Sequence, residues 1–277
     1  MKKTSQTASL SALENLFSEN SIVKLTITRD HWKSIAAGDK FSLLLLGQIF
    51  NEIMIIQKLM FSSHPKGEEN PQFHAMSGQK QLMDRLTAGK IYEAHKAINS
   101  KIIKNFLTNS CFPVLGQDEG KFLLKEFNKK VSGCKWLATA RNGHSMHFPT
   151  PTEWDAAIDY LEKEKIGYSQ FIGKTQSENY FFASAQTALI AFYIESGCEN
   201  THQSATQLHS DLMDLCISLL NLIRRSTLAY MESLVNSPKK ITTLKNTKKF
   251  PKPMMRDFEI PYFFDTTDLK KKMDPEK

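Results

Sequence analysis

Residues 41–62 read FSLLLLGQIFNEIMIIQKLMFS, a run with apolar side chains on almost every side of a helix. These side chains fall on two faces, Leu43, Leu46, Phe50, Ile53 and Met60 on one and Leu45, Ile49, Ile56 and Leu59 on the other. Spacings of three, four and seven residues are helical, so the run predicts a helix. Because a helix that is apolar all round is typically buried, we expect it at the centre of a helical domain.

The segments after this run repeat the helical spacing. We predict helices over 77–107, 117–141, 152–165, 177–196 and 206–234, with Thr152 as the N-cap of the third and 110–116 as a loop. The chain is therefore predicted to be all-α, a bundle of five to seven helices. We expect an N-terminal arm or helical extension over residues 1–40, the helical domain over 41–236, and an irregular basic tail over 237–277.

Length and composition are those of a globular protein: 277 residues, 41% hydrophobic and 23% charged. Four widely spaced cysteines, Cys111, Cys134, Cys198 and Cys216, form no C-x-x-C pair and suggest reduced thiols. Polar residues interrupt the 41–62 run, and the N-terminus lacks the apolar stretch of a signal peptide. We therefore expect a cytoplasmic protein with no membrane partner.

Positive charge is concentrated near the C-terminus. The chain carries 36 basic and 29 acidic residues, a net charge of +7. Residues 239–256 contain no acidic residue and seven basic ones, namely Lys239, Lys240, Lys245, Lys248, Lys249, Lys252 and Arg256. Such a segment can bind the phosphate backbone of RNA, and a solvated tail is the alternative. The aromatic residues from Phe258 onward suggest docking on the body of the protein or on a partner.

The candidate catalytic residues lie in the segment 141–149, RNGHSMHFP. Arg141 continues the stripe of Phe127 and Cys134 at intervals of seven, so we expect it on an inward helical face. Asn142-Gly143 is a turn signal, and a break there would let Arg141 converge with His147. Arginine matches phosphate with a planar set of donors, and histidine exchanges protons near neutral pH.

The Arg-Asn pair followed by four residues and His147 resembles the R-polar-x4–6-H motif of the HEPN superfamily, which consists of all-α domains. The resemblance implies a metal-independent endoribonuclease, a hydrolase of defence or toxin–antitoxin systems that needs no cofactor. Arg141 would stabilise the phosphate, His147 would act as general acid and base, and Asn142 would position them. Because one chain carries one motif, the resemblance also implies a homodimer, with an antitoxin or other defence protein as a further partner.

Three residues are secondary candidates, and two other functions stay open. His144 lies one turn after Arg141, while Asn51 and Glu52 belong to a polar stripe on the 41–62 helix. Glu52 could pair with Arg141 in a purely structural ion pair. The other alternative is a non-catalytic helical module that binds RNA, a nucleotide or a protein without turnover.

Overall fold

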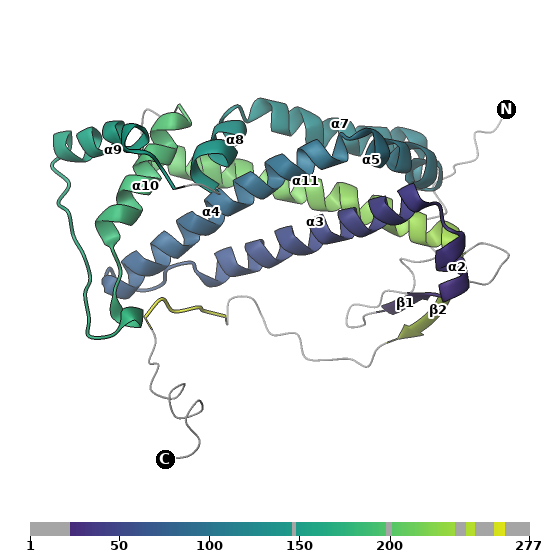
Figure 1. Cartoon of the computed structure of the whole chain (residues 1–277), viewed down its shortest axis with the longest axis horizontal. Helices are drawn as coiled ribbons and strands as arrows, with labels where there is room; N and C mark the ends of the chain where they lie inside the picture. Colours follow the sequence, from purple (N-terminus) through teal and green to yellow (C-terminus); the bar gives the residue numbers. More distant parts are fainter. Residues whose placement is uncertain (1–22, 146–147, 198–200, 236–241, 247–257, 264–277) are drawn as a thin grey trace, which may run out of the picture. The chain divides into compact units, whose positions relative to one another are not determined.

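The computed structural model describes residues 23–145, 148–197, 201–235, 242–246 and 258–263. Helices dominate them, which confirms the all-α prediction (Figure 1). The long helices are α3 (Ala37–Ser62), α4 (Pro71–Ile98), α7 (Gln117–Gly133), α9 (Pro151–Lys163), α10 (Phe182–Glu195) and α11 (Thr201–Val235). The short α-helices are α2 (Arg29–Ser34), α5 (Lys101–Phe106), α6 (Phe112–Leu115) and α8 (Trp136–Thr139).

Two predicted helices are interrupted. The helix expected over 77–107 divides into α4 and α5 at Ser100, whose backbone is extended (φ −64°, ψ 151°) and which caps α5. The Ser100 hydroxyl accepts the backbone N–H of Ile103, which is the usual role of an N-cap serine. The helix expected over 117–141 ends at Gly133, and the next residue has the non-helical angles φ −93° and ψ 74°.

The segment predicted as a loop over 110–116 is mostly helical. The chain passes from α5 into a π-helical turn, η1 (Leu107–Cys111), and then into α6. Pro113 lies in the first turn of α6, a position at which proline is tolerated. Gly116 then ends α6 with φ 107°, a backbone angle that favours glycine.

The C-terminal tail is not wholly irregular, contrary to the prediction. β2 (Thr242–Asn246) pairs antiparallel with β1 (Val23–Ile27), with Leu25 opposite Leu244. Helical periodicity cannot indicate this pairing, because the two partners come from opposite ends of the chain.

The chain divides into two compact units. The first comprises residues 1–54, 91–134 and 213–253. Its described core combines side chains from α3, α4, α5, α7 and α11, among them Leu46, Ile53, Ile91, Ile98, Ile103, Phe106, Phe127, Leu215, Leu219 and Leu222. Phe106 packs edge-on against Tyr230 of α11, with ring centroids 4.8 Å apart. Arg225 of α11 forms an ion pair with Glu119 of α7.

The second unit comprises residues 55–90, 135–212 and 254–277. Here α9 lies beside α10 (Figure 1), and Ala157 and Leu161 pack against Ile190 and Ala191. The C-terminal aromatic segment docks on this unit, as the sequence suggested. Tyr262 donates to the Asn179 carbonyl at 3.1 Å and packs edge-on against Tyr180, with centroids 4.8 Å apart.

Helix α3 is only partly buried, so the prediction of a wholly buried helix is wrong. Leu46, Ile53 and Met60 are buried, whereas other apolar residues are exposed, namely Phe41, Leu44, Ile55, Leu59 and Phe61. Length and composition would allow α3 to cross a membrane, alone among the helices described. A single such helix is weak evidence, because core helices of soluble proteins share these properties.

Candidate functional site

The Arg-Asn-Gly-His segment lies in a π-helical turn, η2 (Ala140–Ser145), that directly follows α8. Since α7 has already ended at Gly133, the predicted stripe joining Phe127, Cys134 and Arg141 on one continuous helix is wrong. Asn142-Gly143 does not break the helix either, because the turn widens there instead. Single π-helical turns occur frequently at functional sites, which makes η2 a candidate.

His144 is the most completely described member of this segment. Its side chain is only 4% exposed, and its Nε2 lies 2.9 Å from Oε2 of Glu195 at the end of α10. The ring nitrogen makes no hydrogen bond within the described residues, so its approach to that oxygen is a close contact without hydrogen-bond geometry. The Glu195 side chain is 30% exposed, so the carboxylate faces solvent on one side and the imidazole on the other.

Aromatic packing fixes the position of His144. Its ring centroid lies 5.4 Å from that of Phe192, one turn before Glu195 on α10. Trp136, at the start of α8, contacts the same Phe192 nearly edge-on, with centroids 6.2 Å apart. Gly143 gives the carboxylate room, because a Cβ at this position would lie 3.2 Å from Glu195 Oε2. One aromatic side chain of α10 thus supports both ends of the α8–η2 segment.

The other predicted motif residues are described in part. Arg141 is half-buried in η2, and the backbone of Asn142 belongs to the same turn. His147 lies outside the described residues, so its predicted convergence with Arg141 stays a prediction. Phe148, the next residue, is fully exposed.

Asn51 and Glu52 lie on α3 in the first unit, whereas Arg141 belongs to the second. Glu52 accepts a hydrogen bond of 2.6 Å from Gln48, one turn earlier on the same helix. Asn51 and Gln48 both line a groove in the first unit together with Arg224 of α11.

Among the predicted RNA-binding residues, only Lys245 falls within the described part of the chain. It lies in β2, in register with Lys24 of β1. The other six lie outside the described residues: Lys239, Lys240, Lys248, Lys249, Lys252 and Arg256.

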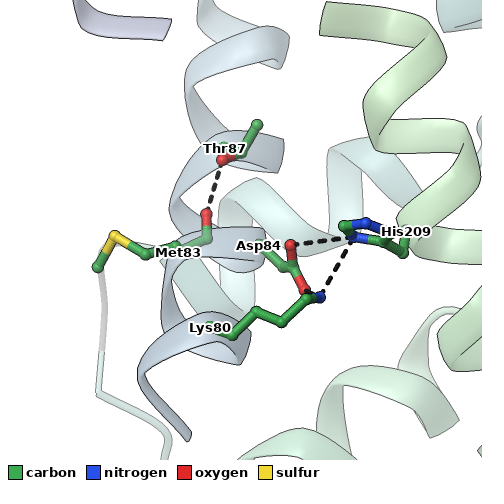
Figure 2. A network of polar contacts seen from close by, with 5 residues as sticks. All are labelled: Lys80, Met83, Asp84, Thr87 and His209. Atoms are coloured by element: carbon green, nitrogen blue, oxygen red, sulfur yellow. Dashed lines mark hydrogen bonds and ion pairs between the residues drawn. The ribbon is translucent and has the colours of Figure 1, made fainter. Parts of the chain in front are cut away.

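The second unit also contains a polar network that was not predicted from the sequence. Lys80 Nζ donates to Asp84 Oδ2 at 2.9 Å, and His209 Nδ1 lies 3.3 Å from Lys80 Nζ and 3.5 Å from Asp84 Oδ1 (Figure 2). Lys80 and Asp84 are four residues apart on α4, a spacing that indicates an ion pair from the sequence alone. His209 comes from α11, 129 residues after Lys80, so no local pattern connects it to them.

Glu195 also had no sequence signal, because nothing near it in the chain suggests a histidine partner. Within the described residues, no three or more histidine, cysteine or acidic side chains gather in an arrangement that could hold a metal ion. The histidine–carboxylate contact joins the turn that carries the Arg-Asn motif to the end of α10.

Comparisons with known proteins gave no match to this chain among protein-family models, curated proteins or solved structures.

Proposed function

We propose that the chain is a metal-independent endoribonuclease that acts in phage defence or as a toxin, as a homodimer in the cytoplasm. The observation that carries the proposal is the α8–η2 segment, where the Arg-Asn motif occupies a π-helical turn held by His144 against Glu195 and Phe192. Such support gives a reacting group a fixed position, which transition-state stabilisation requires.

In the proposed reaction, the 2′-hydroxyl of a ribose attacks the adjacent phosphorus. His147 of one protomer takes the hydroxyl proton, and the same residue of the other protomer gives a proton to the departing 5′-oxygen. Arg141 donates to the non-bridging oxygens, which gain charge in the transition state. The bond to the 5′-oxygen breaks, leaving a 2′,3′-cyclic phosphate and a free 5′-hydroxyl. His144 and Glu195 are positioning residues in this scheme.

Single-stranded RNA is the expected substrate class. Unpaired bases stack on aromatic side chains, and Phe148 presents a fully exposed ring one residue after His147. Basic residues of the segment 239–256 would add a salt-sensitive contribution to affinity through the RNA backbone. Any antitoxin would be expected to cover the same motif.

A second candidate, a non-catalytic binding module, is favoured by one observation. The His144 side chain is almost completely buried, which is typical of a histidine with a structural role. In that case Arg141 and the basic tail would hold RNA without cleaving it.

The decisive experiment incubates purified full-length protein with total RNA in EDTA and maps the product ends. We expect wild type to leave 2′,3′-cyclic phosphates, and R141A and H147A to lose cleavage by about a hundredfold or more. The matched controls H64A and R29A remove exposed side chains of the same types elsewhere and should cleave normally. If wild type only binds RNA, in a salt-sensitive manner, the binding module replaces the nuclease. Equal cleavage by wild type and H147A would refute the assigned site.

A further inference from the structure

The first unit contains an apolar groove that the proposed ribonuclease does not use. It lies between α3 and α11, with Ile27 of β1 and Trp32 of α2 also in its walls, and has a volume of about 780 Å³. Most of the lining side chains are apolar, among them Leu43, Leu44, Leu228 and Met231. This volume lies within the range of about 300–1,000 Å³ that is typical of small-molecule sites.

Gly47 keeps the groove open along α3. This glycine lines the groove, and a Cβ built on it would meet no atom within 4 Å from the described residues outside its own helical turn. Glycine is disfavoured in the middle of a helix, and here it leaves free space instead of permitting a close backbone contact. A longer side chain at position 47 would therefore begin in open space and project into the groove.

The charge of the groove selects the kind of ligand. Arg224 is the one charged residue among its described lining residues, and no hydrogen bond or ion pair joins its guanidinium to another described side chain. The adjacent Arg225, in contrast, is paired with Glu119. The remaining polar side chains in the walls, Gln48, Asn51 and Thr227, are uncharged. A ligand that complements this surface is apolar along most of its length and negatively charged at one end.

We propose that the groove binds a single-chain anionic amphiphile, a fatty-acid-like carboxylate with its head group on Arg224 and its chain along Leu43, Leu44 and Leu228. From Leu43 to Asn51, eight steps along α3 span about 12 Å. An extended chain advances about 1.2 Å per bond, so about ten carbons match this length. The site lies wholly in the first unit, so it does not rest on the proposed nuclease, whose motif is in the second.

The test measures binding of decanoate, octanoate and decanol to the full-length protein by calorimetry, below the concentrations at which the two carboxylates form micelles and below the solubility limit of decanol. We expect one saturable site for decanoate. Each methylene contributes about fourfold in affinity, so octanoate should bind about sixteenfold more weakly. Decanol should bind about tenfold more weakly than decanoate, because it lacks the charge that Arg224 recognises.

Variants locate the site. R224Q should weaken decanoate about tenfold and leave decanol unchanged, whereas K58Q, which removes an exposed charge elsewhere on α3, should have no effect. G47L should abolish binding of both ligands, and G47A should retain it. Circular dichroism checks the fold of each variant, and R224Q remains informative if G47L does not fold. The absence of saturable binding, equal affinity for decanoate and octanoate, or decanoate binding unaffected by both R224Q and G47L would overturn the proposal.

Discussion

At the scale of single residues, the sharpest steric constraint in the second unit is between Gly78 of α4 and Tyr180. A Cβ on Gly78 would come within 1.8 Å of the Tyr180 hydroxyl oxygen, so the tyrosine depends on the missing side chain. We expect G78A to cost about 1–3 kcal/mol of unfolding free energy, because the buried ring must move. Urea unfolding followed by circular dichroism measures this cost.

The control for this prediction is G47A, which also places alanine in a helix interior but brings its Cβ within 4 Å of no atom from another part of the described chain. It should be stabilising by about 0.5–1 kcal/mol. Y180F removes the closest atom, so the double variant G78A/Y180F should recover part of the loss. Equal effects of G78A and G47A would mean that the two residues do not approach as described.

Only those parts of the candidate site that depend on neighbouring residues in the chain could be predicted from the sequence. Arg141, Asn142 and His144 were identifiable, because a motif is a local property of the chain. Glu195 was not, because its contact with His144 depends on how α10 packs beside η2. His209 escaped for the same reason, since it is 129 residues from Lys80.

At the scale of elements, the start of α9 depends on Thr150 and not on the expected Thr152. Glu153 Oε2 accepts both the backbone N–H of Thr150 at 2.6 Å and its hydroxyl at 2.8 Å. Pro151 then occupies the first helical position, which proline favours and which could have identified the cap from sequence. T150A should therefore cost about 1 kcal/mol, whereas T152A should cost less than about 0.5 kcal/mol. Thermal unfolding compares the two; a larger loss for T152A would restore the sequence prediction.

The docked C-terminal segment supports a second prediction at this scale. Its backbone is tied to the second unit by Ile260 N–H to the Ser62 carbonyl and Phe263 N–H to Gln72 Oε1. Tyr262 adds a ring contact and a hydrogen bond, so Y262A should cost about 2–4 kcal/mol. Phe258, an exposed aromatic of the same segment, is the matched control, and F258A should change the urea midpoint little. Similar losses for both variants would contradict this docking.

For the molecule as a whole, the periodicity of apolar residues predicted the fold class well, because each helical segment shows this spacing independently of the others. The buried leucines of α11, from Leu208 to Leu222, follow the expected spacing. The breaks were harder to predict, because Gly133 and Ser100 end or begin helices without changing the spacing of apolar residues around them. Pairing of β1 with β2 depends on contact between opposite ends of the chain, which no local pattern encodes.

Each unit contains a buried tyrosine whose ionisation opposes folding. The free energy of unfolding of the whole molecule should therefore fall at alkaline pH. Burial, reinforced by Tyr262, raises the pKa of Tyr180 in the second unit to about 12. Burial, with Asp39 and Cys111 nearby, raises the pKa of Tyr230 in the first unit to about 12 as well. In the unfolded chain these phenols ionise near pH 10. The folded state therefore holds more protons between pH 10 and 12, and stability must fall as the pH rises through that range.

Each tyrosine should account for a loss of about 2–3 kcal/mol across this range, since one pKa unit corresponds to about 1.4 kcal/mol. The measurement is urea unfolding at pH 9 and pH 11.5 for wild type, Y180F and Y230F, with the exposed Tyr168 replaced in Y168F as the control. Y180F and Y230F should each lose less stability on alkalinisation than wild type, because a phenylalanine cannot ionise. Y168F should follow wild type, and an alkaline loss identical in all four proteins would mean that neither buried phenol is protected by folding.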